Sequence, residues 1–189
     1  MSEPTPDQIA IRHTERDMLD ALHNRYSVVS QGDSIRYACA EHVRSHASFD
    51  ARRTCDFMAQ DLWHTGGLAL HGHEVKVSRS DWLRELADPS KAEEFRRYCD
   101  RWWLVVPDAS IVRDDLPPGW GLMALDAHGK LRVKKPAPVL TPVPHPPTFR
   151  ASLLRSVAKT NARRGSVIAA VRADGERWEK KYYDLLERR

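Results

Sequence analysis

Two short runs of strand-like sequence, joined by a turn signal, constrain the fold of this chain more than any other feature. The first run, residues 52–63, is apolar around its centre, and the second, residues 74–77, alternates charged and apolar side chains. Between them, Gly66 and Gly67 signal a turn. Because consecutive strands usually pair, we expect a β-hairpin over about residues 54–77.

This hairpin would gather three charged side chains. Side chains two apart on a strand share a face, so Glu74 and Lys76 project together, and the turn brings Asp56 close to Glu74. Two carboxylates and a backbone carbonyl, that of Val75, are the oxygen ligands that hard divalent cations prefer. A neighbouring lysine can steady a phosphate or the attacking water. Hydrolysis of phosphodiesters is a reaction that can use this arrangement.

A purely structural explanation fits the same residues. Asp56 could pair with a nearby arginine or a loop amide, and Lys76 could simply neutralise Glu74. The acid-x-Lys spacing is not specific in itself, because Glu179 and Lys181 repeat it in a stretch that is typical of a helix. Neighbours on a helix lie three or four residues apart, so those two side chains would not share a face.

Four blocks of residues surround these positions within residues 35–135. In chain order they are Arg52-Arg53-x-x-Asp56, Glu74-Val-Lys-Val-Ser-Arg-Ser-Asp81-Trp82, Tyr98-Cys99-Asp100-Arg101 and Val105-Val106-Pro107. The order and content of the blocks resemble the PD-(D/E)XK nuclease superfamily and, within it, the MmcB-type DNA-repair nucleases. The resemblance implies an α/β fold with a restriction-endonuclease-like core, in which helices flank a mixed central sheet, followed here by a C-terminal helical extension.

The resemblance also implies an activity and a site. The expected activity is metal-dependent hydrolysis of DNA phosphodiester bonds in DNA repair or processing, with Asp56, Glu74 and Lys76 as catalytic residues. The metal, Mg²⁺ or Mn²⁺, would be held by Asp56, Glu74 and the carbonyl of Val75. Three histidines between the two acids depart from the family pattern: His64, His71 and His73. They make a zinc site conceivable. The alternative is that they have surface or supporting roles.

Three further residues are candidates for the site. Many superfamily members have an acid on the first core helix near the metal, which makes Glu41 a candidate ligand or supporting residue, although it could also be an ordinary helical glutamate. Arg79 and Arg101 are candidates for phosphate contacts, and each could equally pair with Asp81 or Asp100.

Proline content and charge divide the chain. Residues 136–147 contain six prolines in twelve positions, which predicts a stiff connection. Residues 150–189 carry 11 Lys+Arg and 5 Asp+Glu, a net charge of +6, whereas the rest carries 19 and 21, a net charge of −2. The predicted units are an N-terminal helix in residues 1–32, the core in 33–135, a proline-rich linker in 136–148 and a basic helical extension in 149–189.

The extension has two interpretations. A basic tail favours DNA as a partner, but many solvated helices are also basic. Its last helix carries an apolar stripe, Val171, Trp178, Tyr182 and Leu185, which must pack on the core, on a second copy in a homodimer, on a partner protein or along DNA.

Periodicity and capping signals predict the remaining elements. Helices are expected at 5–25, 33–45, 80–86, 90–98, 149–161 and 165–189, and strands at 102–106, 121–125 and 130–133. Glu41 falls on the second of these helices. Trp102 and Trp103 could pack in the core or offer one ring for base stacking.

Composition excludes several classes of protein. No run of eighteen apolar residues exists, so we expect no membrane span and a cytoplasmic protein. Three cysteines argue against a disulfide framework and against a four-cysteine cluster.

The rival to a nuclease is a non-catalytic DNA-binding module of the same fold that acts with a partner. A third interpretation is a structural or regulatory protein with chance motifs. Metal uptake through Asp56 and Glu74 distinguishes the first from the others.

Overall fold

The computed structural model describes residues 12–29, 34–46 and 53–187. Within them, six strands form one mixed sheet in the order β1-β2-β3-β4-β5-β6. The pairs β3-β4 and β4-β5 are parallel, and the other three pairs are antiparallel. The strands are β1 (Tyr37–Arg44), β2 (Thr54–Asp61), β3 (Leu70–Val75), β4 (Arg101–Val106), β5 (Trp120–Leu125) and β6 (Leu131–Lys135).

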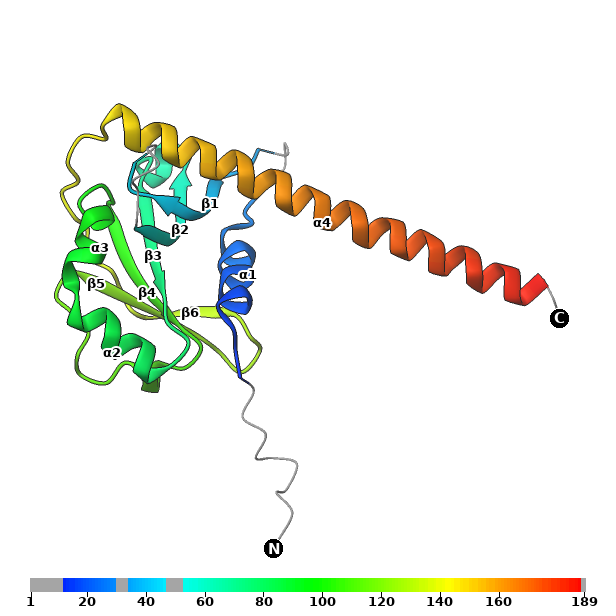
Figure 1. Ribbon diagram of the computed structural model, residues 1–189, viewed down its shortest axis with the longest axis horizontal. Coiled ribbons are helices and arrows are strands. Elements are labelled where there is room, and N and C mark those ends of the chain that lie inside the picture. The colour runs from blue at the N-terminus through cyan, green and yellow to red at the C-terminus, as the bar shows by residue number, and fades with distance from the viewer. Residues whose placement is uncertain (1–11, 30–33, 47–52, 188–189) are drawn as a thin grey trace, which may run out of the picture.

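Helices cover both faces of the sheet (Figure 1). On one face α1 packs through Met18, Leu19 and Leu22 against residues of β2, β4 and β5. On the other face lie α2, α3 and the first turns of α4, which bury Trp82, Phe95 and Phe149. The helices are α1 (Glu15–Tyr26), α2 (Arg79–Ala87), α3 (Pro89–Arg96) and α4 (Pro147–Glu187), and two short 3₁₀ helices lie at His64–Gly66 and Ala109–Ile111. The expected α/β fold with a helical extension is therefore confirmed.

The predicted hairpin is confirmed. β2 and β3 are antiparallel and joined through the turn that contains Gly66 and Gly67. Gly67 has φ of +71°, which a residue without a side chain adopts at little cost. The predicted strands at 102–106, 121–125 and 130–133 correspond to β4, β5 and β6, and the helices expected at 80–86 and 90–98 correspond to α2 and α3.

The helix predicted at 33–45 is wrong. Tyr37–Arg44 is strand β1, which pairs with β2 in the register Glu41↔Phe57 and Val43↔Cys55. The spacing of Ile35, Ala38 and Val43 resembles a helical face, but pairing with β2 and cover by α4 decide the conformation. Glu41 therefore lies on a strand.

The C-terminal extension is one helix of 41 residues, α4, where two helices were expected. Asn161 and Gly165 do not interrupt it, because the preceding turns are held against β1 through buried side chains such as Thr160. The N-terminal helix begins at Glu15, where Thr14 and Asp17 form a capping box; its predicted first part, up to residue 11, lies outside the described residues.

Both tryptophans of β4 belong to the core. Trp102 is fully buried on the face covered by α2 and α3, and Trp103 is 6% exposed on the face covered by α1. Core packing is therefore the interpretation that holds, and neither ring is open to a base. The proline-rich segment lies against the core too, since the backbone nitrogen of Leu140 donates to the carbonyl of Asp100 at 2.8 Å.

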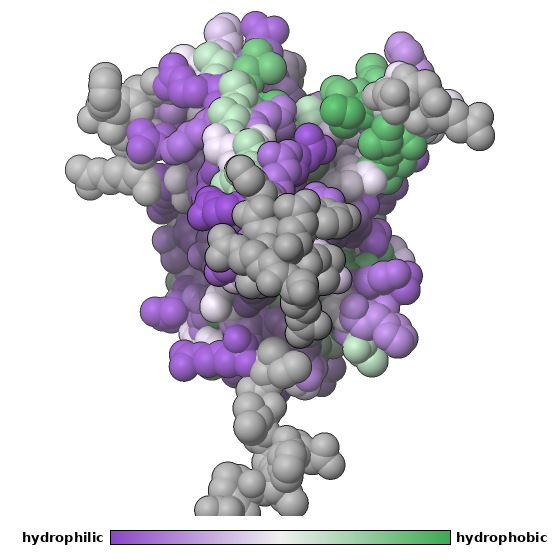
Figure 2. Space-filling model, turned by 90° about the vertical axis from the view of Figure 1, so that its right-hand side faces the viewer, coloured by the Kyte–Doolittle hydropathy of each residue, from purple (hydrophilic) through white to green (hydrophobic). Residues whose placement is uncertain are grey.

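One side of the molecule is seen in the space-filling view. The side toward which the C-terminus of α4 points is mostly hydrophilic, with hydrophobic residues gathered in two places near its upper edge (Figure 2). None of the helices in the described part of the chain is long and apolar enough to cross a membrane.

Candidate metal and phosphate site

Three neighbouring strands place three potential ligands in one row. The pairs Glu41↔Phe57 and Val43↔Cys55 put His42 of β1 opposite Asp56 of β2. The pair Phe57↔His73 puts Asp56, one position further along the same register, opposite Glu74 of β3. The hairpin thus brings together the two acids that the sequence analysis singled out, and the third strand adds a histidine that it did not.

A backbone hydrogen bond positions Asp56. Its Oδ2 accepts from the backbone nitrogen of Val75 at 2.8 Å. Burial raises the pKa of Asp56 above its usual range. Burial also raises the pKa of Glu74, to about 8, and the negative charge of Asp56 adds to this effect. Two carboxyl groups that resist ionisation together would be stabilised as carboxylates by a cation.

Lys76 lies beside Glu74 as expected but within a larger ion network. Its Nζ is 2.6 Å from Oε1 of Glu74 and 3.1 Å from Oε2 of Glu85 on α2. Lys91 of α3 reaches the same two oxygens at 3.1 Å and 3.0 Å. Burial alone would lower the pKa of Lys76, but Glu74 and Asp56 outweigh burial and raise it. Both lysines are therefore cations: they pair with the carboxylate of Glu85 and donate hydrogen bonds to Oε1 of Glu74.

The network is buried and not fully satisfied. Glu74 is 2% exposed and Lys76 6%. Oε1 of Glu85 is buried without a hydrogen-bond partner among the described residues. An unpaired buried carboxylate oxygen is costly unless a cation, a water or a donor reaches it. The carboxylate of Glu85 can therefore still bind a cation or accept a further hydrogen bond.

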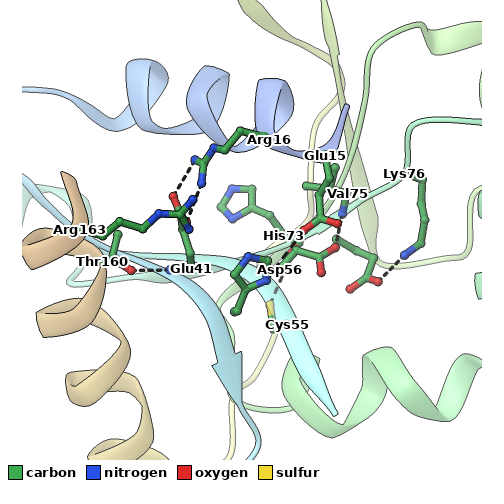
Figure 3. Close-up of polar contacts among 12 residues, drawn as sticks. Glu15, Arg16, Glu41, Cys55, Asp56, His73, Val75, Lys76, Thr160 and Arg163 are labelled. Atoms are coloured by element: carbon green, nitrogen blue, oxygen red, sulfur yellow. Dashed lines mark hydrogen bonds and ion pairs between the residues drawn. The ribbon is translucent and has the colours of Figure 1, made fainter. Parts of the chain in front are cut away.

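A second group of ligands meets at Asp56. Glu15, His42 and Asp56 each offer one ligand atom, and these atoms lie within 4.8 Å of one another. Figure 3 shows Glu15, at the start of α1, pointing toward Asp56. The backbone of His42 has φ of +49°, a conformation that is uncommon for a residue with a side chain and recurs at functional sites.

The donor chemistry of this group fits a divalent cation. Two carboxylates supply the hard oxygens that Mg²⁺ and Mn²⁺ bind, and the imidazole adds a nitrogen that suits a transition metal. Glu15, Lys76 and Lys91 lie near Asp56, and Asp56 and Glu85 lie near Glu74. Because burial disfavours the negative charges of Asp56 and Glu74, a bound cation would stabilise both as carboxylates.

Glu41 belongs to a different cluster. Its carboxylate accepts from Arg16 at 2.9 Å and 2.7 Å and contacts His23 at 2.8 Å. Arg163 of α4 lies 3.6 Å away. Burial would raise the pKa of Glu41, but the hydrogen bonds from Arg16 and His23 lower it to about 2. Glu41 thus links α1, β1 and α4: its charge faces the cations Arg16 and Arg163, and it contacts His23, whose pKa is lowered by burial.

The two arginines proposed as phosphate contacts are held by the protein itself. Arg79 pairs with Asp115 and donates to the carbonyl of Ile111. Arg101 donates to the carbonyl of Ala137 at 2.5 Å. The alternative partners Asp81 and Asp100 have other contacts, since Asp81 pairs with Arg84 and Asp100 accepts from the backbone of Leu70.

The three histidines near the hairpin do not converge on a zinc site. His73 is fully buried, contacts the hydroxyl of Tyr26 at 2.8 Å and lies 3.3 Å from the carbonyl of Phe57. His71 accepts from the indole nitrogen of Trp103 at 3.3 Å, and His64 lies in the 3₁₀ helix of the turn. Burial lowers the pKa of both His71 and His73, so they are neutral core residues at pH 7.

A basic groove adjoins the row of ligands. It has a volume of about 200 Å³ and lies between β1 and α4, with His42 in its wall. Its cationic lining comes from both elements: Arg44, Arg155, Lys159 and Arg163. The one acid in the lining, Glu41, is already paired. The wall of the groove thus contains both these cationic side chains and His42, which lies opposite Asp56.

Some of these residues have no local sequence signal. Glu15 and His42 are far from Asp56 in the chain, and no motif marks either one. The basic residues of α4 do have a signal, the net charge of the C-terminal segment, although charge alone does not indicate which face they occupy.

Comparison with known proteins identifies a similar fold. No protein-family model matches the chain, and no curated protein matches it. Among solved structures, the chain is similar to the SPO1766 protein of unknown function from Silicibacter pomeroyi, with 22% identity and a TM-score of 0.54. The match covers 86% of this chain and 93% of that chain. At this identity the likeness concerns the fold alone.

Proposed function

We propose that the protein is a metal-dependent DNA nuclease of the PD-(D/E)XK type, acting in DNA repair or processing. The observation that carries the proposal is the row of His42, Asp56 and Glu74 across β1, β2 and β3, with Lys76 beside it. The resemblance of the sequence blocks supports the same conclusion. Hydrolysis of a phosphodiester needs a cation near an acidic cluster and a positive group near the phosphate.

Asp56 and Glu74, with the carbonyl of Val75, are the proposed ligands of Mg²⁺ or Mn²⁺, and Glu15 and His42 extend the ligand set. The bound ion would activate water and offset the charge that builds on the scissile phosphate. Because an imidazole nitrogen is a better ligand for Mn²⁺ than for Mg²⁺, we expect Mn²⁺ to bind more tightly.

Lys76 has two roles in this proposal. Its ammonium group holds Glu74 and Glu85 in place, at 2.6 Å and 3.1 Å. When Glu74 turns to a cation, Lys91 can keep Glu85 neutralised, and Lys76 becomes available to orient the attacking water or to stabilise the charged phosphate. Lys91 is therefore a supporting residue that allows Lys76 to change partners.

The groove between β1 and α4 is the proposed path for the DNA backbone. Arg44, Arg155 and Lys159 line it and could each contact a phosphate, and His42 lies in the same wall. Arg79 and Arg101 are not needed for this path, because their guanidinium groups already have partners.

A second candidate is a non-catalytic DNA-binding module that acts with a partner protein. The observation that favours it is that Lys76 and Lys91 already contact Oε1 of Glu74, and that Glu74 is only 2% exposed. The basic groove serves either function. For both candidates we propose a cytoplasmic setting, where the DNA of such a pathway would be found.

The test is cleavage of single-stranded, duplex and branched DNA with Mg²⁺ or Mn²⁺, by the native chain and by Lys76→Ala. Lys130→Ala is the matched control, because Lys130 is an exposed lysine at the β5–β6 turn. Metal-dependent cutting that is lost only in Lys76→Ala supports the nuclease. DNA binding without cutting by any variant would support the binding module, and equal cutting by all variants would indicate another site or a contaminant.

A further inference from the structure

The second half of α4 extends away from the rest of the molecule (Figure 1). Every described side chain from residue 165 onward along this helix is exposed. The exposed side chains include large hydrophobic ones: Ile168 at 51%, Val171 at 66%, Trp178 at 67% and Tyr182 at 60%. Apolar groups of this size cost free energy in water, so the segment is suited to a partner.

The spacing of these residues is that of a coiled-coil seam. Ile168, Val171, Gly175, Trp178 and Tyr182 follow one another at intervals of three, four, three and four residues. In the sequence, Leu185 continues the pattern. A repeat of this kind places one narrow stripe of each helix against another helix. The partner that the stripe fits is therefore an α-helix.

We propose that the partner is the same segment of a second copy of this chain, packed antiparallel. When two copies are aligned so that their seams interlock, Gly175 of each faces Trp178 of the other, and Val171 of each faces Tyr182 of the other. The indole of Trp178, the largest side chain of the seam, thus packs against Gly175, which has no side chain. A Cβ at Gly175 would meet no atom within 4 Å in the single chain, so the space is open to a ring from outside.

Charge supports the same alignment. The residues that flank the seam are Arg172, Asp174, Glu179 and Lys181. In the antiparallel arrangement Asp174 of each copy lies beside Lys181 of the other, and Arg172 lies beside Glu179, so all four contacts are attractive. In a parallel pair Asp174 would lie beside Glu179, Trp178 would meet Trp178, and Gly175 would leave a gap.

The length of the exposed segment matches the overlap. In this alignment the last helical residue, Glu187, of one copy lies level with Ser166 of the other. That is where α4 leaves the core, because Thr160 is still buried and Arg164 is paired with Asp20. The two segments therefore overlap over about 33 Å without either helix end entering a core. The two cores lie at opposite ends of the pair.

The pair would be weak, because three heptads are near the lower limit for a stable coiled coil. Sedimentation velocity of the full chain over about 1–100 μM should show a reversible monomer–dimer equilibrium. Trp178→Ala should abolish the dimer up to the highest concentration. Because Trp178 is exposed in the single chain, the far-ultraviolet circular dichroism of the variant should stay unchanged.

Charge reversal tests the orientation. Asp174→Lys should weaken the dimer by about tenfold, since it places two lysines together at both symmetric contacts. Adding Lys181→Asp to this variant should restore affinity to within about threefold. Glu176→Lys is the matched control, because it changes the net charge equally on a side of the helix away from the seam, and it should leave the dissociation constant unchanged.

Three outcomes would overturn the proposal. A native chain that remains monomeric over the whole concentration range has no such interface. A dimer that Trp178→Ala leaves intact uses another surface. Tighter association of Asp174→Lys would mean a parallel pair, in which the substitution removes the repulsion from Glu179.

Discussion

Replacing Glu41 by glutamine would show how firmly the N-terminal helix, the edge strand and the C-terminal helix depend on one carboxylate. Glu41 of β1 accepts two hydrogen bonds from Arg16 of α1, at 2.9 Å and 2.7 Å. Its backbone nitrogen donates to the hydroxyl of Thr160 of α4 at 2.9 Å. Glutamine keeps the volume and the backbone contact but removes the negative charge that the guanidinium of Arg16 faces.

The magnitude follows from the pKa of Glu41. Burial would raise this pKa, but the hydrogen bonds from Arg16 and His23 lower it from 4.5 to about 2. A difference of this size corresponds to about 3 kcal/mol of folding free energy at pH 7. Because the folded-state pKa is the lower one, this contribution is complete above pH 4.5 and is lost as the pH falls through 2. Near pH 3 roughly 1.4 kcal/mol should remain.

The assay is urea unfolding of the native chain and Glu41→Gln, followed by circular dichroism at pH 7 and near pH 3. We expect the free-energy difference between the two proteins to fall by about half between these conditions. Glu93→Gln is the control, because Glu93 is 57% exposed and pairs with Arg96 at the surface; it should change stability by less than about 0.5 kcal/mol. An equal loss for Glu41→Gln at both pH values would refute the argument, since it would mean that the charge of Glu41 contributes nothing.

Three other expectations follow from the site and the core. Because burial and Asp56 raise the pKa of Glu74 to about 8, Mn²⁺ that binds Glu74 at pH 7 should displace a proton, and its affinity should increase as the pH rises through 8. Calorimetry in two buffers of different ionisation enthalpy measures this proton release. If no proton is released, Glu74 is not a ligand. Lys159→Ala should reduce the salt dependence of DNA binding by about one counterion, as titrations at several salt concentrations would show, and an unchanged slope would exclude Lys159 from the DNA path. Gly72→Ala should destabilise the fold by about 1–3 kcal/mol, because its Cβ would overlap the ring of Trp102; thermal unfolding that is unchanged would show that this ring has room to move.

The hairpin and its acids could be predicted because their signals are local. Side chains alternate along a strand, and a short turn fixes the register of the two strands that it joins. Asp56 and Glu74 are separated by one hairpin only, so their approach follows from the same few residues that form it. The parallel strands β4 and β5 were also recognisable, since each is a short apolar run ending near a turn or a proline.

The edge strand was mistaken for a helix because its sequence carries a weak local preference. Tyr37–Arg44 contains alanines and a cysteine that satisfy helical spacing, and what makes it a strand is pairing with β2 and contact with α4. α4 lies more than a hundred residues further along the chain. The same contact keeps α4 continuous through Gly165, where the sequence favoured a break. Local propensity differs by about 1 kcal/mol per residue at most for such positions, so tertiary packing decides.

The hairpin, the acid pair with its lysine, and the apolar stripe near the C-terminus are encoded locally, because each depends on spacing within a few residues. Which other groups surround them depends on how the helices and strands pack. Glu15 and His42 reach Asp56 through the packing of α1 and β1, and Glu85 and Lys91 reach Lys76 through α2 and α3. These contacts depend on how helices and strands pack, and no spacing along the chain encodes them.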